Sequence, residues 1–271
     1  MRIAIEQVRR MKGGAQSHLM RCDDGGYYVV KFQNNPQHVR VLANEMLATR
    51  LAARLGICVP QVEVVDVSTN LIDLTTELVM QMRRGRNPCS PGKQFGSRFP
   101  GNPSVLVIHE CLSDESISRV TNIDDFLGIY VFDKWTCNTD SRQAIFVELT
   151  NTDCSAESNK TFQAIMIDQG FCFNCGYWNF PDAPLRSLYA NRSVYQSLVG
   201  MEALDRWIDL LESEFTLNDL YNEAQQVPLE WLGQDHAAWD RLIENLFERR
   251  LRVRELIRSA LNVIPNPFMN W

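Results

Sequence analysis

Three polar residues in the middle of the chain have the types and the spacing of a phosphoryl-transfer site. Asp133 is followed five residues later by Asn138, and Asp168 ends a second apolar run just before Gln169 and Gly170. Enzymes that transfer phosphoryl groups place an acid, an asparagine and a metal-binding aspartate in this order. We therefore predict that Asp133 accepts or orients the proton of the attacking hydroxyl, and that Asn138 and Asp168 hold Mg²⁺ through their oxygen atoms.

Two basic residues lie close to this acid in the sequence. Lys134 follows Asp133 directly, and it either neutralises charge on the transferring phosphoryl group or simply faces solvent. Arg142 either fixes the segment after Asn138 by pairing with an aspartate or is a surface residue. We count Lys134 with Asp133 and Asn138 as the predicted catalytic set.

The N-terminal part supplies groups suited to a phosphate donor. A glycine turn between two strand-like segments lets backbone amides approach phosphates without a side-chain clash. Lys31 ends the next strand-like run, and Glu45 follows on a helix, where an acid can hold that lysine toward a nucleotide. Taken singly, these features are a common turn, a solvated lysine and a surface acid. Their order favours ATP binding by Lys31, Glu45 and the turn residues Gly13, Gly14, Ala15, Gln16 and Ser17.

The composition is that of a globular protein, with 45% apolar and 22% charged residues. No apolar run approaches the roughly 18 residues that span a bilayer, and the N-terminus lacks the apolar stretch of a signal peptide. Eight cysteines in 271 residues are too sparse for a disulfide scaffold, which predicts reduced thiols in a cytoplasmic protein. Cys172 and Cys175 have no second pair at matching spacing, so metal or redox use is not expected there.

Apolar periodicity predicts strands mainly in the first half of the chain and helices mainly in the second. Strands are expected within 2–32 and at 62–67, 105–108, 144–149 and 162–167, the last two around a polar turn at 151–160. Helices are expected at 37–55, 70–82, 124–135, 201–215, 217–226 and 236–262, the first of them stopped by Gly56. Residues 83–104, rich in Arg, Gly, Pro and Ser, are predicted to form a long loop.

These motifs resemble the HipA-like kinases, and more closely the small stand-alone HipA-like kinase domains of bacteria. The likeness covers roughly residues 8–200. Its most specific parts are residues 132–143, around Asp133, and residues 167–171, around Asp168. The glycine turn, the strand end at Lys31, the pair Asn44-Glu45, Leu55–Pro60 and Phe95–Arg98 also contribute.

The resemblance implies an α+β, bilobal protein-kinase-like fold that is also related to the phosphatidylinositol kinases. A β-rich N-terminal lobe, residues 1–112, and a mainly helical C-terminal lobe, residues 113–271, would hold ATP and Mg²⁺ between them. By the same analogy the backbone near Glu110 and Leu112 would meet adenine. HipA toxins are longer, and we expect their additional N-terminal region to be absent here. No His-Arg-Asp precedes Asn138 either, so a toxin role is not assumed.

We therefore predict an ATP- and Mg²⁺-dependent kinase that acts on a protein serine or threonine. Because the motifs describe only the donor side, a lipid or small-molecule acceptor is an alternative. A nucleotide-binding pseudokinase or partner-binding module is another. A nucleic-acid-associated regulator would use Arg83, Arg84 and Arg86, but the net charge of −6 argues against it. No membrane role is expected, and the sequence identifies neither the protein substrate nor the oligomeric state.

Overall fold

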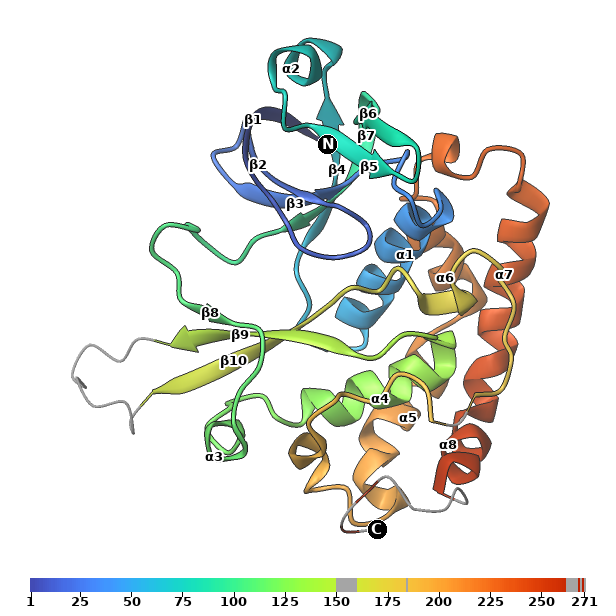
Figure 1. The fold of residues 1–271 in the computed structure, drawn as a ribbon. Helices are drawn as coiled ribbons and strands as arrows, with labels where there is room; N and C mark the ends of the chain where they lie inside the picture. Colours follow the sequence, from blue (N-terminus) through green and yellow to red (C-terminus); the bar gives the residue numbers. More distant parts are fainter. Residues whose placement is uncertain (150–159, 184, 262–267, 269, 271) are drawn as a thin grey trace.

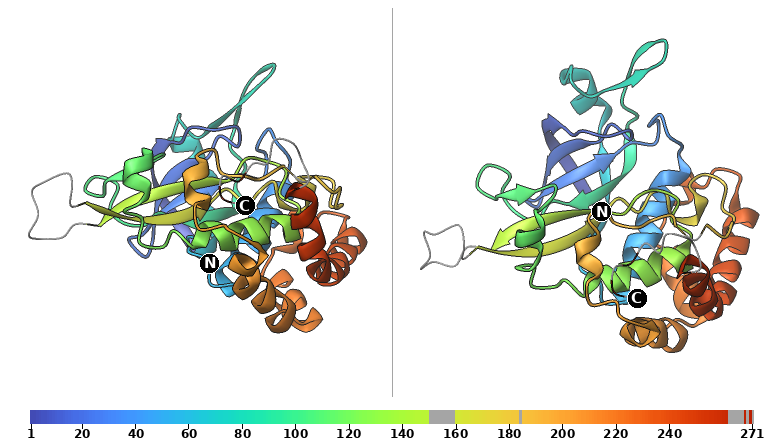
Figure 2. Two further views of the ribbon diagram at one scale, coloured as in Figure 1. Left: turned by 90° about the horizontal axis from the view of Figure 1, so that it is seen from below. Right: turned by 60° about the horizontal axis from the view of Figure 1, so that its bottom comes forward.

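The computed structural model describes residues 1–149, 160–183, 185–261, 268 and 270. Figure 1 shows a β-barrel formed by the N-terminal part, a separate sheet beside it, and helices that gather at the other side of the molecule. The views in Figure 2 show the same arrangement from below and from an oblique angle. Within the described residues, no helix is both long and apolar enough to cross a membrane.

The barrel closes five strands in the order β1-β2-β3-β7-β4. Neighbouring strands are antiparallel except β1 and β4, whose parallel pairing closes the barrel. The strands are β1 (Arg2–Arg10), β2 (His18–Cys22), β3 (Tyr27–Lys31), β4 (Val62–Val67) and β7 (Gly92–Arg98). The strands predicted at 62–67 and within 2–32 are therefore confirmed. A small apolar cluster that includes Tyr28, Val30 and Val65 fills the barrel.

The long loop predicted at 83–104 is wrong, because this segment contains β7 and also β6 (Gly85–Pro88). β7 lies between β3 and β4, and Phe95 is buried there. Gly96 suits this strand because a Cβ at its position would overlap Cγ2 of Val65 on β4. A residue type that usually indicates a turn is here required by a close approach of two strands.

Two further boundaries differ from the sequence-based expectation. The helix predicted at 70–82 ends early as α2 (Thr69–Leu74), because Thr75 is extended and β5 (Val79–Met82) then pairs with β6. The strand predicted at 105–108 reduces to β8 (Ile108–His109), and Val105 is 78% exposed rather than buried. The polar turn predicted at 151–160 lies almost entirely outside the described residues.

Helix α1 (Arg40–Arg54) lies between the barrel and the C-terminal helices in Figure 1. Most of its residues are buried, because it contacts β4 and β7 on one side and helices on another. The chain leaves it through Gly56, whose φ of +85° is the left-handed conformation that glycine adopts easily. The predicted helix at 37–55 and its stop are confirmed.

The second sheet has the order β10-β9-β8 and lies next to α4 in Figure 1. Its long strands are β9 (Gln143–Leu149) and β10 (Thr161–Ile167), as predicted. The helices before and after it are α3 (Asp114–Ile117), α4 (Asp125–Thr136), α5 (Asp205–Glu214), α6 (Leu217–Ala224), α7 (His236–Arg249) and α8 (Val253–Leu261). Short 3₁₀ turns lie at Cys172–Asn174, Arg192–Tyr195, Met201–Leu204, Leu229–Trp231 and Arg250–Arg252. One large apolar cluster joins α1, α4 and these later helices.

Replacing Gly96 by alanine should destabilise the barrel by about 2 kcal/mol, because the new methyl group overlaps Val65. The loss should be measured as the free energy of unfolding in urea. In a Val65→Ala background the same change should cost clearly less, since the overlapping atom is gone. Equal costs in both backgrounds would contradict this account of Gly96.

Candidate active site

A cavity of about 460 Å³ lies between the barrel and the sheet β8–β10. Val29 and Phe95 line it from the barrel, and isoleucines of β9 and β10 line it from the sheet. Its polar lining includes Lys31, Glu45 and Asp168. The cavity therefore combines apolar walls with a group of buried charges, as ligand sites usually do. The isoleucines are Ile145, Ile165 and Ile167.

Three charged side chains that are distant in sequence meet at this cavity. The ammonium group of Lys31, at the end of β3, donates to Oδ1 of Asp168 at 2.8 Å and also to Oε1 of Glu45 on α1. The Lys31 and Glu45 side chains are almost fully buried, whereas the Asp168 side chain is 31% exposed. The structure thus brings together the lysine, the helix acid and the second aspartate, and leaves the last one accessible from the cavity.

The two carboxyl groups that contact the Lys31 ammonium, those of Glu45 and Asp168, have very different pKa values. Burial alone would raise the pKa of Asp168, but the Lys31 ammonium, a hydrogen bond with Glu45 and the charge of Arg142 together outweigh burial and lower that pKa to about 2. Burial raises the pKa of Glu45 to about 7, more than the same ammonium lowers it. The difference follows from the deeper burial of Glu45 and from the neighbouring Asp168 carboxylate, which raises the pKa of Glu45 further. Asp168 is therefore the carboxylate that stays ionised at neutral pH.

A second buried ion pair joins α4 to the segment before Asp168. Nε of Arg142 donates to Oδ2 of Asp133 at 2.9 Å, and its NH2 group donates to Oδ1 of the same carboxylate. NH1 of Arg142 donates to the carbonyl oxygen of Ile167 at 2.9 Å and to the side chain of Gln169. Neither side chain of the pair is exposed to solvent. Arg142 therefore pairs with an aspartate, as one of the two sequence-based interpretations held.

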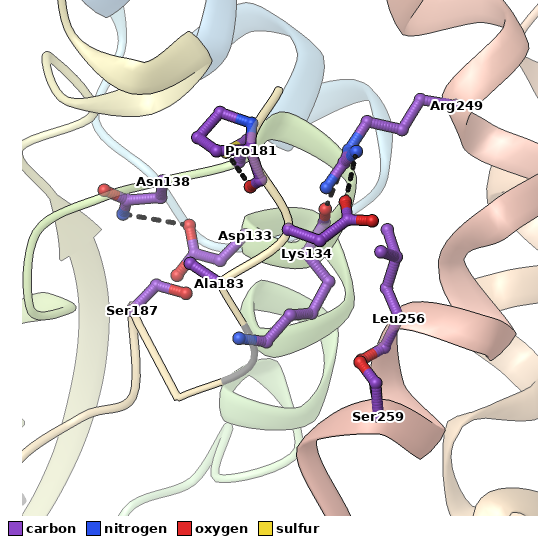
Figure 3. A pocket seen from close by; sticks show the side chains of 11 residues that line it. Asp133, Lys134, Asn138, Pro181, Ala183, Ser187, Arg249, Leu256 and Ser259 are labelled. Carbon is purple, nitrogen blue, oxygen red and sulfur yellow. Dashed lines mark hydrogen bonds and ion pairs between the residues drawn. The ribbon is translucent and has the colours of Figure 1, made fainter. Parts of the chain in front are cut away.

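Asn138 lies beside this pair. Its amide nitrogen donates to Oδ1 of Asp133 at 3.1 Å, and Figure 3 shows the two side chains facing one another. Its amide oxygen accepts a hydrogen bond from the backbone of Asp140 at 3.1 Å and keeps a second lone pair. Both oxygens of Asp133 thus accept hydrogen bonds, and the side chain has no solvent contact. Its carboxylate therefore holds Asn138 and Arg142 next to one another.

Asp140 is a carboxylate that the sequence-based set leaves out. It is half-buried on the turn after α4, and its one hydrogen bond described here comes from the backbone of Ser141 at 2.8 Å. The backbone of Thr139 donates to the carbonyl oxygen of Phe171 at 3.2 Å, which sets this turn against the segment that follows Asp168. A sequence signal existed: Asp133 lies inside an apolar run, whereas Asp140 lies in the polar run that follows it.

Lys134 points away from the large cavity. Its ammonium donates to the carbonyl oxygen of Arg186 at 2.8 Å and lies 5.2 Å from the ring centre of Tyr130. Burial lowers the pKa of Lys134 to about 8, more than the neighbouring Asp133 raises it. Figure 3 shows Lys134 in a separate small cavity of about 10 Å³, which Asp133 and Asn138 also line. That volume holds about one water molecule, so a nucleotide does not fit there.

The predicted nucleotide-binding residues divide into two groups. Ser17 and Glu110 line the large cavity together with Lys31 and Glu45. The other predicted residues do not line it: Gly13, Gly14, Ala15, Gln16 and Leu112. Leu112 instead packs half-buried against the main apolar cluster. The glycine turn itself is formed, with Gly13 at a φ of +113° and a hydrogen bond of 2.8 Å from the backbone of Met11 to that of Ser17.

Two side chains at this site have oxygen atoms suited to a metal ion. The described residues contain no cluster of three or more His, Cys, Asp or Glu side chains suited to a metal ion. Mg²⁺ needs less, because it usually binds one or two protein oxygens together with water and phosphate oxygens. The accessible carboxylate of Asp168 and the free lone pair of Asn138 have the chemistry for that role. Cys172 does not, since its buried sulfur accepts a hydrogen bond from Thr136.

The segment after Asp168 is held by Asn44, the neighbour of Glu45 on α1. Its buried amide nitrogen lies 2.8–3.1 Å from three backbone carbonyl oxygens of this segment, those of Gly170, Cys172 and Cys175. Its oxygen accepts from the indole of Trp178 at 2.8 Å. The segment needs such support because several non-glycine residues have positive φ, which is unfavourable for side-chain-bearing residues. These are Asp168, Phe173, Asn174, Cys175 and Trp178.

Comparisons with known proteins identify the family and the fold of the chain. A family model for HipA-like kinases matches residues 4–255. Hydra Fam20, solved with sugar, has a TM-score of 0.54 at 13% identity, over 96% of this chain and 86% of that one. HipA from Shewanella oneidensis MR-1, solved with HipB and operator DNA, has a TM-score of 0.53 at 13% identity, over 94% and 68%.

A Golgi casein kinase solved with Mn and ADP has a TM-score of 0.51 at 13% identity, over 93% of this chain and 74% of that one. At such identities the three structures show a shared kinase-like fold and no more. A comparison with curated protein sequences finds no match.

Replacing Asn44 by alanine should lower the free energy of unfolding by about 3 kcal/mol, because buried carbonyl groups and an indole N–H lose their partner. Trp178→Phe is the matched control, since it removes the indole hydrogen bond and part of a buried ring but leaves the three carbonyl contacts of Asn44, and it should cost about 2 kcal/mol. Urea unfolding measures both. Asn44→Ala costing no more than the control would show that Asn44 does not hold this segment.

The stability of the protein should fall as the pH rises from 5 to 7.5, because the pKa of Glu45 is raised to about 7 in the folded state. An exposed glutamate, as in the unfolded chain, has a pKa of about 4.3. The tighter binding of a proton by Glu45 in the folded state therefore stabilises the fold fully below about pH 4.3, and this stabilisation is lost as the pH rises through about 7. Glu45→Gln, which carries no titrating proton, should flatten the fall in unfolding free energy.

The exposed acid Glu244, replaced by glutamine, is the control and should leave the slope unchanged. The lowered pKa of Asp168, about 2, acts at lower pH and does not overlap with this window. An unchanged slope in Glu45→Gln would contradict the assignment.

Proposed function

Because the chain belongs to the family of HipA-like kinases, we propose that it transfers the γ-phosphoryl group of ATP to a serine or threonine hydroxyl of a protein. In this proposal residues 1–112 form an ATP-grasping lobe and residues 113–271 a catalytic lobe of a bilobal kinase in the cytoplasm. The observation that carries the proposal is the meeting of Lys31, Glu45 and Asp168 at a cavity large enough for a nucleotide.

The donor side of the proposal follows from the lining of the cavity. Apolar walls such as Ile165 and Phe95 suit a nucleobase, whereas the ammonium of Lys31 suits phosphate oxygens. Glu45 keeps that ammonium directed into the site. The Golgi casein kinase solved with Mn and ADP supports a nucleotide and a divalent ion in this fold. Glu110 lies at the cavity as well and is the proposed neighbour of the base.

Asp168 and Asn138 are the proposed ligands of Mg²⁺. Asp168 offers an ionised carboxylate that is partly exposed, and Asn138 offers an amide oxygen. The bound ion would neutralise negative charge on the phosphate oxygens. The hydrogen bond from Asn138 to Asp133 fixes the amide so that its oxygen faces away from that carboxylate. Asp133 therefore acts on the metal site by orienting Asn138.

The proton acceptor must come within hydrogen-bond reach of the acceptor hydroxyl. Asp133 was predicted for this role, yet both of its oxygens are engaged by buried partners. Asp140 is half-buried, its carboxylate accepts a single described hydrogen bond, and its turn adjoins the Asp168 segment. We therefore propose that Asp140 accepts or orients the proton. Asp133 and Lys134 are then positioning residues that hold this turn and the segment near Arg186.

Conservative amide variants should separate these roles. Asp140→Asn should lower the rate of phosphoryl transfer by about 100-fold or more, with the melting temperature little changed. Asp168→Asn should lower the rate as much and should also lower the melting temperature, because the buried Lys31 ammonium loses one of its two counter-charges. Asp133→Asn should instead destabilise the fold by about 3 kcal/mol, because Arg142 loses its buried counter-charge. Transfer of radiolabel from γ-labelled ATP and thermal unfolding measure the two effects.

If Asp140→Asn keeps full activity and Asp133→Asn is folded but inactive, Asp133 and not Asp140 is the proton acceptor. Full activity in Asp168→Asn would show that Asp168 is not a ligand of Mg²⁺. Wild-type protein that binds ATP in calorimetry but transfers no label to any protein, lipid or small-molecule acceptor would overturn the kinase proposal itself.

A further inference from the structure

The hairpin β5–β6 carries an exposed basic tip. Arg83 and Arg84 form the turn between the two strands, and Arg86 follows on β6. All three are exposed, and in both views of Figure 2 the hairpin projects from the barrel. Among the residues that the structure describes, no carboxylate lies within ion-pair distance of these arginines. The kinase chemistry proposed above leaves them without a role.

This hairpin is joined to the glycine turn. Nε2 of Gln16 donates to the carbonyl oxygen of Gln81 at 2.8 Å, and the backbone amide of Gln81 donates to Oε1 of Gln16 at 2.7 Å. Arg86 pairs across the hairpin with Gln81 and donates to its side chain at 3.1 Å. Arg10 donates to the side chain of Gln16. Two guanidinium groups thus flank the junction between the hairpin and the glycine turn.

The positive charge continues from this junction to the cavity. Arg9 and Lys12, which precede the glycine turn, both line the cavity that contains Lys31 and Asp168, and the Lys12 ammonium lies 3.8 Å from the carboxylate of Glu110. Arg9, Arg10 and the hairpin arginines have no described ion pair, although the chain as a whole carries a net charge of −6. Like charges placed together without counter-charges repel one another, so such a group is suited to an anionic partner.

We propose that this basic rim, Arg10 with Arg83, Arg84 and Arg86, binds an acidic segment of the protein that receives the phosphoryl group. The proposal rests on the kinase function above. The rim adjoins the glycine turn, which ends at Ser17 in the lining of the cavity, so a segment bound at the rim would lie beside the proposed donor site. Carboxylates bound there would hold the acceptor hydroxyl near the donor and would steer association. An acidic peptide fits better than nucleic acid, because the net negative charge of the chain opposes a long polyanion.

The experiment compares two double variants that change the charge equally. Arg83→Glu with Arg84→Glu reverses the tip of the hairpin, and Arg241→Glu with Arg258→Glu reverses two exposed arginines on α7 and α8 as the control. Two synthetic peptides carry one serine flanked either by glutamates or by alanines. Peptide binding is measured by fluorescence anisotropy, and phosphoryl transfer by steady-state kinetics.

The wild-type protein and the control should bind the glutamate peptide about tenfold more tightly than the alanine peptide, a difference that added salt reduces. The hairpin variant should lose this preference through a higher KM for the glutamate peptide, while its kcat and its KM for the alanine peptide stay unchanged. Equal affinities in the hairpin variant and the control, or tighter binding of duplex DNA than of the glutamate peptide, would overturn the proposal. Loss of binding in the hairpin variant with no transfer by any protein would support the rim and reject the kinase function.

Discussion

The burial of the Lys31 ammonium is the constraint on which the rest of the site depends. A buried charge is tolerated only when paired partners replace the water that it has lost. Lys31 finds them in Glu45 on α1 and in Asp168 after β10. Meeting that requirement brings the barrel, the helix behind it and the second sheet to one point, and the cavity lies where they meet.

A second buried charge, that of Arg142, fixes the backbone just before Asp168. Arg142 is held by Asp133 and by the carbonyl oxygen of Ile167, so α4 and the end of β10 cannot separate without exposing an unpaired guanidinium. Asn44 then anchors the following segment to α1. A chain with so many positive φ values needs these contacts, because its local conformation is unfavourable by itself.

Much of the fold was predictable from the apolar pattern, because α1, β9 and β10 bury apolar faces and α4 is apolar and buried along almost its whole length. β7 was not predictable, since its glycine and polar composition are typical of a loop. Only the close approach of Val65 shows why Gly96 belongs in a strand. The site was likewise predictable only in part. The types and order of Lys31, Glu45 and Asp168 indicated a phosphate-binding site, whereas their mutual contacts follow only from the fold.

The sequence by itself determined which reactive groups the chain has and the order in which they follow one another. The tertiary structure alone decided which carboxylate is buried and which is accessible, as Asp133 and Asp140 illustrate. The physical reason is that burial and pairing depend on partners supplied by other elements. Asp133 is paired with Arg142, which lies just before β9, and Asp168 is paired with a lysine 137 residues earlier in the chain. Spacing along one segment carries no information about such partners.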